Sequence, residues 1–142
     1  MPLSDDQAIA AVLREVKTIA LLGASHKPER PSHRVMRFLL EQGYRVFPIN
    51  PGLAGTELLG QTVLASLADF PEPVDMVDVF RDPSHLPGIV DETIRAGIGT
   101  LWTQLDVIDL KAAGRAEAHG IRVVMDRCPA IEAPRLERLG LL

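Results

Sequence analysis

The sequence has little cysteine, few aromatic residues and no long apolar run. Its 142 residues include a single cysteine, Cys128, and only 4% aromatic residues. One cysteine cannot form an internal disulfide, and no Cys/His cluster has zinc-site spacing, so the sequence predicts no metal site and favours a reducing, cytoplasmic environment. The first twenty residues carry Asp5, Asp6 and Glu15 without a long apolar stretch, which argues against a signal peptide or a membrane span.

An excess of positive charge is also absent. The chain has 15 Lys and Arg against 19 Asp and Glu, a net charge of −4 that argues against a general nucleic-acid-binding protein. Hydrophobic residues make up 46% and charged residues 24%, which is ordinary globular composition. A chain of this length can bury one core. We therefore expect a single domain over residues 1–142.

Helix-like spacing and compact apolar runs alternate along the chain. Ser4 and Gln7 form a capping-box pattern that predicts a peripheral cover helix over about residues 5–15. Ser32 is the expected N-cap of a second helix that stops at Gly43. Strands are expected at residues 18–22, 46–49, 76–80, 100–103 and 122–125, with a further short strand near 62–63, and helices at 86–96 and 108–119.

This alternation predicts an α/β fold of βαβ units. Parallel strands need right-handed helical crossovers, so the helices should cover both faces of a doubly wound, mostly parallel sheet of about five strands. In such sheets ligands bind beyond the carboxyl ends of the strands. The segments expected at those ends contain four basic residues, which predict a basic rim on an acidic protein: Lys27, Arg30, Arg81 and Arg127.

The first strand-end loop begins like a dinucleotide fingerprint at Gly23. The second and third glycines are missing, and Ser25 and Lys27 stand in their region, which weakens the case for ordinary NAD binding. A hydroxyl, backbone amides and a lysine before a helix still suit a phosphate, although a solvated polar loop is the alternative. Asn50 stands where NAD domains place an acidic residue, which suits a phosphorylated ribose, or it only forms a turn.

Two residues raise the question of catalysis. Asp78 interrupts an apolar strand, so it is either a general base or, more commonly, an acceptor for loop amides. Cys128 ends the last strand loop and could be a nucleophile if Arg127 lowers its pKa, but buried structural thiols are commoner. Neither residue has a catalytic partner placed by the sequence, so the sequence predicts no catalytic residue.

Aromatic and histidine side chains have similar alternatives. Trp102 could stack on an adenine, but a single aromatic residue inside an apolar strand usually belongs to the core. Three histidines fall near expected helix starts and either touch phosphate or are surface imidazoles: His26, His33 and His85.

Six short segments at and near the strand ends form a recognisable set. They are IALLGAS (19–25), RPS (30–32), PINP (48–51), VDVFR (77–81), LWTQL (101–105) and MDRC (125–128). Each segment is weak alone, but together they span about residues 15–130. As a set they resemble the stand-alone CoA-binding domain family, whose Rossmann-like module also forms the N-terminus of succinyl-CoA synthetase α subunits.

The resemblance implies binding of coenzyme A (CoA) or an acyl-CoA at the carboxyl ends of the strands. The nucleotide would lie along the first loop, where Arg30 adds charge, and across the loops that follow the other strands. Relatives place glycine where this chain has Asp106, a residue type that tolerates left-handed backbone. The implied cofactor-binding residues are Gly23, Ala24, Ser25, Lys27, Arg30, Asn50, Pro51, Phe80, Arg81, Thr103 and Gln104.

In the ligase, the phosphorylated histidine and the catalytic partner domains lie outside this module, so we expect no self-contained ligase chemistry. The alternatives are an NAD(P)-binding oxidoreductase domain, an acyl-CoA enzyme that uses Cys128 or Asp78, and a CoA-responsive regulator that acts through an unidentified protein partner. The sequence leaves open whether Cys128 reacts with the CoA thiol.

Overall fold

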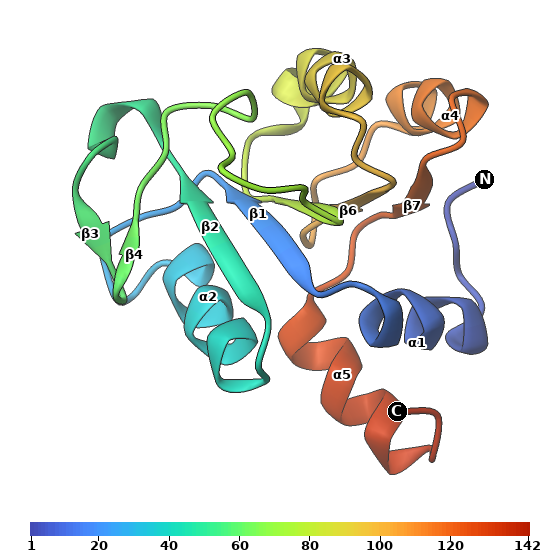
Figure 1. Ribbon diagram of the computed structural model, residues 1–142. Helices are drawn as coiled ribbons and strands as arrows, with labels where there is room; N and C mark the ends of the chain where they lie inside the picture. Colours follow the sequence, from blue (N-terminus) through green and yellow to red (C-terminus); the bar gives the residue numbers. More distant parts are fainter.

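The computed structural model describes residues 1–142, and its centre is a parallel sheet of five strands in the order β2-β1-β5-β6-β7 (Figure 1). Every neighbouring pair in this sheet is parallel. The chain runs from β1 outward to β2 and later from β5 outward to β7, so the strand order reverses between β1 and β5. The strands are β1 (Thr18–Leu22), β2 (Arg45–Ile49), β5 (Met76–Val79), β6 (Thr100–Thr103) and β7 (Arg122–Val124).

Helices cover both faces of the sheet (Figure 1). One face carries α1 (Asp6–Glu15), α2 (Pro31–Glu41) and α5 (Pro129–Arg138). The opposite face carries α3 (Leu86–Ala96) and α4 (Leu110–Ala118). This arrangement confirms the predicted doubly wound α/β fold.

Two apolar clusters fill the space between the sheet and its helices. Along β1, Ile19 and Leu21 belong to the cluster under α1, α2 and α5, whereas Ala20 and Leu22 belong to the cluster under α3 and α4. Successive side chains of a strand point to opposite faces, so a strand in the middle of this sheet must be apolar at every position. All five residues of β1 are buried for this reason.

The predicted starts of the first two helices are wrong in detail. The cap of α1 is Asp5, whose carboxylate accepts a hydrogen bond from the Ala8 amide, instead of Ser4. Ser32 lies inside α2 and is buried, because that helix already begins at Pro31. Proline suits the first helical position, where the missing N–H would have no partner in any case.

Two further elements differ from the predictions. The short strand predicted near residues 62–63 is β4 (Gln61–Thr62), which pairs with β3 (Glu57–Leu58) in a separate antiparallel hairpin and not in the main sheet. The sequence argument missed α5. Pro134 lies inside that helix and lacks a backbone N–H donor, so its presence argued against a helix there. The segment is helical because Ala133 and Leu136 are buried in the core and their packing stabilises it.

Candidate functional site

The first strand-end loop crosses the end of β5 at very short range. Gly23 has a φ of +95°, and a Cβ atom built there would lie 2.7 Å from the carbonyl oxygen of Phe80. Only glycine combines this backbone conformation with so close an approach. The amides of Gly23 and Ala24 both donate to the Ile49 carbonyl, at 3.0 and 3.1 Å, so the loop is fastened to the end of β2 on its other side.

Asn50 joins this loop to the one that follows β2. Its Oδ1 accepts a hydrogen bond from the Gly52 amide at 2.9 Å, and its Nδ2 donates to the Ala24 carbonyl at 2.8 Å. Asn50 therefore forms a turn, and it also lies on the cleft lining described next. A second local turn follows in the first loop, where Ser25 Oγ accepts from the Lys27 amide at 3.1 Å.

These loops border a cleft of about 1050 Å³ at the carboxyl edge of the sheet. All of the predicted cofactor-binding residues except Thr103 line it. The beginnings of two helices form its walls, with Arg34 and Val35 from α2 and Ala130 and Ile131 from α5. The sequence argument did not assign these residues to the site. Those of α5 were left out because the helix was missed, and those of α2 because only the strand-end loops were considered.

Thr103 lies beneath the cleft. It is fully buried, its Oγ1 donates to the Val107 carbonyl at 2.7 Å, and the same oxygen accepts from the Asp126 amide at 3.1 Å. Asp106 closes this turn with a φ of +68°, and its amide donates to Asp126 Oδ1 at 2.6 Å. The left-handed backbone expected at Asp106 is thus present, and Thr103 shapes the loop from below.

Four cations on the cleft lining have no carboxylate partner. Lys27 and Arg30 are exposed and take part in none of the ion pairs of the protein. The guanidinium groups of Arg34 and Arg81 contact the Glu29 carbonyl and the His85 ring, respectively, and both are without an ion-pair partner. Asp106 is the one acidic residue of the lining. The cleft therefore carries net positive charge, which suits an anionic ligand.

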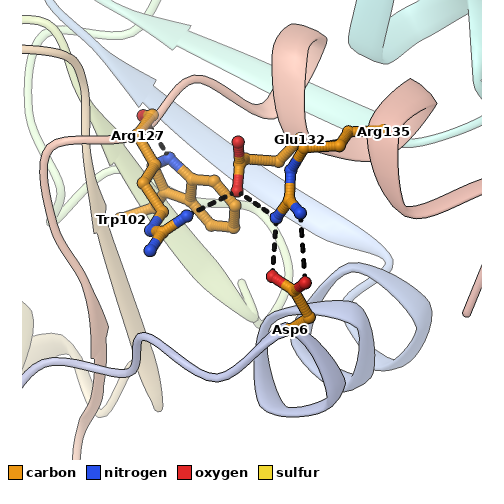
Figure 2. A network of polar contacts seen from close by, with 5 residues as sticks. All are labelled: Asp6, Trp102, Arg127, Glu132 and Arg135. Atoms are coloured by element: carbon orange, nitrogen blue, oxygen red, sulfur yellow. Dashed lines mark hydrogen bonds and ion pairs between the residues drawn. The ribbon is translucent and has the colours of Figure 1, made fainter. Parts of the chain in front are cut away.

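Arg127 does not belong to the basic rim that was predicted. Its guanidinium pairs with Glu132 at 2.8 Å, and Glu132 is shared with Arg135, which also binds Asp6 (Figure 2). The hydrogen bond from Arg135 holds the pKa of Asp6 below its usual value. Trp102 is fully buried and donates from Nε1 to the Arg127 carbonyl at 2.7 Å, so the core interpretation of Trp102 is confirmed.

Asp78 is an unpaired carboxyl group inside the core. It lies on β5 between Leu21 of β1 and Trp102 of β6, and neither of its oxygens has a hydrogen-bond partner. Burial raises the pKa of Asp78 well above its ordinary value. The expectation that Asp78 accepts from loop amides is wrong, and because it does not line the cleft it has no access to a ligand there.

The three histidines lie outside the cleft lining. His26 bonds to Thr56 Oγ1 at 3.1 Å, and His85 contacts Arg81 at 3.2 Å. His33 is buried within α2, so the surface interpretation fails for this one.

Two buried polar groups also line the cleft. Cys128 is 8% exposed and immediately precedes α5, and its thiol makes no capping hydrogen bond to that helix. Gln104 is 7% exposed, and its Oε1 has no hydrogen-bond partner. Buried acceptors are normally satisfied, so Gln104 Oε1 is an exception, and the oxygen itself is buried.

The structure contains no group of three or more His, Cys, Asp or Glu side chains placed to hold a metal ion. None of its helices has the length and apolar character needed to cross a membrane.

Comparison with known proteins decides the family. A protein-family model described as CoA binding domain matches residues 17–134. The chain belongs to this family. The match covers all five strands of the main sheet and every loop that borders the cleft.

Individual relatives of this CoA-binding domain protein agree with the assignment. The chain is 33% identical to the uncharacterized protein YneT of Bacillus subtilis over 84% of this chain and 87% of that protein. The structure of cell-free ID.343 from Thermus thermophilus superposes with a TM-score of 0.89 at 45% identity, covering 94% of this chain and 99% of that one.

A larger relative is the ADP-forming acetate–CoA ligase I subunit alpha of Pyrococcus furiosus. It is 25% identical over 76% of this chain. The chain spans only 26% of that subunit, so the likeness concerns one part of the ligase.

Proposed function

We propose that this protein binds coenzyme A, free or acylated, in the cleft at the carboxyl edge of the sheet. The observation that carries the proposal is the set of unpaired cations on the cleft lining of a member of the CoA-binding family: Lys27, Arg30, Arg34 and Arg81. CoA brings a diphosphate and a ribose 3′-phosphate, together about four negative charges. Cations without a carboxylate partner are free to meet them.

The first loop is the proposed seat of the diphosphate. Gly23 and Ala24 bring backbone close to the cleft, Ser25 and Lys27 add polar groups, and the amino terminus of α2 follows directly. The partial positive charge of a helix amino terminus favours phosphate. In this proposal Arg30 lies at the start of that helix and adds charge to the same seat.

The remaining predicted residues would border the rest of the nucleotide. Pro51 and Phe80 supply apolar walls, and Arg81 is the cation nearest in sequence to the end of β5. Asn50 acts by fixing the two loops to each other, and Thr103 by supporting the turn beneath Gln104.

The proposed role is binding without self-contained ligase chemistry, in the cytoplasm. No residue of the cleft is assigned as catalytic, because the one carboxylate on the lining, Asp106, has no base or nucleophile paired with it. A CoA-responsive regulator that acts through a protein partner remains compatible with this role.

Calorimetric titration at one fixed salt concentration tests the proposal. The ligands are CoA, dephospho-CoA, NAD and NADP. We expect micromolar binding of CoA and about tenfold weaker binding of dephospho-CoA, because a charge-assisted contact to the 3′-phosphate would be lost. Acetyl-CoA, added as a fifth ligand, tests whether the site accepts an acylated thiol.

Heat with NAD or NADP and none with CoA would contradict the proposal and favour the oxidoreductase alternative. Equal affinity for CoA and dephospho-CoA would mean that the protein binds CoA but that its cleft cations do not contact the 3′-phosphate.

A further inference from the structure

The exposed apolar side chains of this protein are unevenly distributed along the chain. Seven large hydrophobic residues are exposed, and three of these lie at the two ends of the chain. The other four belong to the loop after β6, to the start of α4 and to the first turn of α5: Leu105, Ile108, Leu110 and Ile131. Apolar side chains that are exposed as a group, and not singly, mark binding sites.

Two of these four residues line the cleft. Leu105 is 51% exposed and Ile131 is 53% exposed. Val107 and Ala130 line the same cleft beside them in sequence. About half of the surface of Leu105 and of Ile131 is thus left in water, and a ligand that covered it with apolar atoms would be stabilised by the hydrophobic effect.

The loop that carries Leu105 is fixed by hydrogen bonds. The Val107 amide donates to the Gln104 carbonyl at 3.0 Å, and the Val107 carbonyl accepts from Thr103 Oγ1 at 2.7 Å. Between them, the Asp106 amide donates to Asp126 Oδ1 at 2.6 Å. The turn therefore holds Leu105 exposed, and a ligand would meet a surface that is already formed.

Charge is distributed unevenly around the same cleft. The loop after β6 supplies the one carboxylate of the lining, Asp106, which stands between Leu105 and Val107. The unpaired cations come from the first loop, the start of α2 and the loop after β5: Lys27, Arg30, Arg34 and Arg81. Phosphate groups are attracted to these cations and repelled by Asp106. The cleft therefore suits a ligand with one anionic end and one apolar end.

We propose that the acyl-chain patch, formed by Leu105 and Ile131, binds the acyl chain of a medium-chain acyl-CoA. This inference rests on the proposed function, since the cations of the same cleft would hold the nucleotide. The acyl group of an acyl-CoA is attached to its sulfur, at the opposite end of the molecule from the nucleotide. Phosphates and acyl chain can therefore occupy different parts of one cleft, and no bond is formed or broken.

The size of the cleft and of the patch agrees with such a ligand. The cleft volume of about 1050 Å³ is at the upper end of the range of about 300–1000 Å³ that is typical of small-molecule pockets. Two half-exposed side chains can cover only a short stretch of hydrocarbon. A chain of medium length is therefore favoured over an acetyl group, which has little apolar surface to bury.

Calorimetric titration with acetyl-CoA, butanoyl-CoA and octanoyl-CoA at one fixed salt concentration tests this inference. We expect octanoyl-CoA to bind about tenfold tighter than acetyl-CoA, with butanoyl-CoA between them, because part of the longer chain leaves water. Titrations at several temperatures give a second readout. The heat-capacity change of binding should be more negative for octanoyl-CoA than for acetyl-CoA, as burial of apolar surface requires.

Matched variants locate the chain. In Leu105→Ser and in Ile131→Ser the affinity ratio of octanoyl-CoA to acetyl-CoA should fall from about tenfold to about threefold or less, because apolar contact is lost. Each ratio is taken within one variant, and acetyl-CoA binding reports that the variant folds. Leu139→Ser is the control, because Leu139 is 57% exposed at the end of α5 and outside the cleft lining. This variant should keep the full ratio, as should Leu105→Met.

The two proposals fail in different ways. No binding of CoA or of any acyl-CoA overturns the proposed function and this inference with it. Binding of CoA with equal affinity for acetyl-CoA and octanoyl-CoA overturns only the acyl-chain inference. A preference for octanoyl-CoA that survives both serine variants also overturns it, since the chain would then bind elsewhere.

Sedimentation velocity distinguishes another occupant of the patch. A monomer in both the parent protein and Leu105→Ser would agree with a patch that serves the ligand. A dimer that Leu105→Ser dissociates would mean that a second copy of this chain covers the patch, and would overturn the inference.

Discussion

Two regions of the molecule use arginine in opposite ways. One is the contact between α1 and α5, and the other is the cleft at the carboxyl edge of the sheet. In the first region Arg127 and Arg135 share Glu132, and Arg135 also binds Asp6, so each guanidinium has a carboxylate (Figure 2). In the second region Arg30 and the other cleft cations have none. The difference teaches that paired arginines hold the fold and unpaired ones are available for a ligand.

The largest effect is expected from breaking the paired region at its shared carboxylate. Glu132→Ala leaves two arginines without their common partner, and its side chain is only 9% exposed. The free energy of unfolding should fall by about 2 kcal/mol, because a nearly buried acceptor of charged hydrogen bonds is lost. Urea unfolding measures this change.

Glu137→Ala is the matched control, because Glu137 is exposed on the same helix and forms no ion pair. An equal loss of stability in both variants would show that helix propensity, and not the network, explains the result.

A binding effect is expected from the unpaired region. Arg81→Ala should weaken CoA binding about tenfold, because one charge-assisted contact is removed. Stability should change little, since no ion pair is lost. Arg95→Ala removes the same charge from the exposed end of α3, outside the cleft lining, and serves as the control in calorimetry. Equal weakening in both variants would mean that only net charge matters.

The smallest effect concerns the unpaired carboxyl group of Asp78 inside the core. The folded protein keeps the Asp78 proton above pH about 4, where the unfolded chain releases it. Stability is therefore lost as pH rises from about 4 toward the raised pKa. Asp78→Asn removes this loss, so the variant should be more stable than the parent near pH 7.5, by about 1 kcal/mol, and the gain should shrink toward pH 4.

Urea unfolding across this pH range gives the difference curve. Glu92→Gln, an exposed carboxyl on α3, should give a flat difference. A flat difference for Asp78→Asn as well would mean that Asp78 ionises alike in the folded and unfolded states.

Much of the fold was predictable because burial on both sides leaves a plain sequence pattern. The runs at β1 and β6 were bounded correctly, and α3 was predicted over its observed residues. The hairpin of β3 and β4 was not recognised, because two-residue strands carry no periodicity. The helix α5 was missed because Pro134 opposes it locally, and only its packing in the core stabilises it.

The candidate site was predictable for a related reason. Parallel strands bring their carboxyl ends to one edge, so the loops after β1, β2, β5 and β6 had to meet once the strands were placed. The sequence identified Gly23 as the first glycine of a dinucleotide-like loop, and the structure adds its close crossing over Phe80. The roles of Thr103 and Arg127 were not predictable, since whether a strand-end side chain faces the cleft or the layer below depends on the exact turn.

The sequence by itself determined the alternation of strands and helices and the gathering of Lys27, Arg30 and Arg81 at one edge, because both follow from local pattern and parallel topology. The tertiary structure alone decided which charges are paired. Asp6 and Arg135 are 129 residues apart, and Asp78 lacks a partner in the middle of an apolar strand. Hydrogen bonds and ion pairs form between groups that meet in space, and distance along the chain does not report which groups meet.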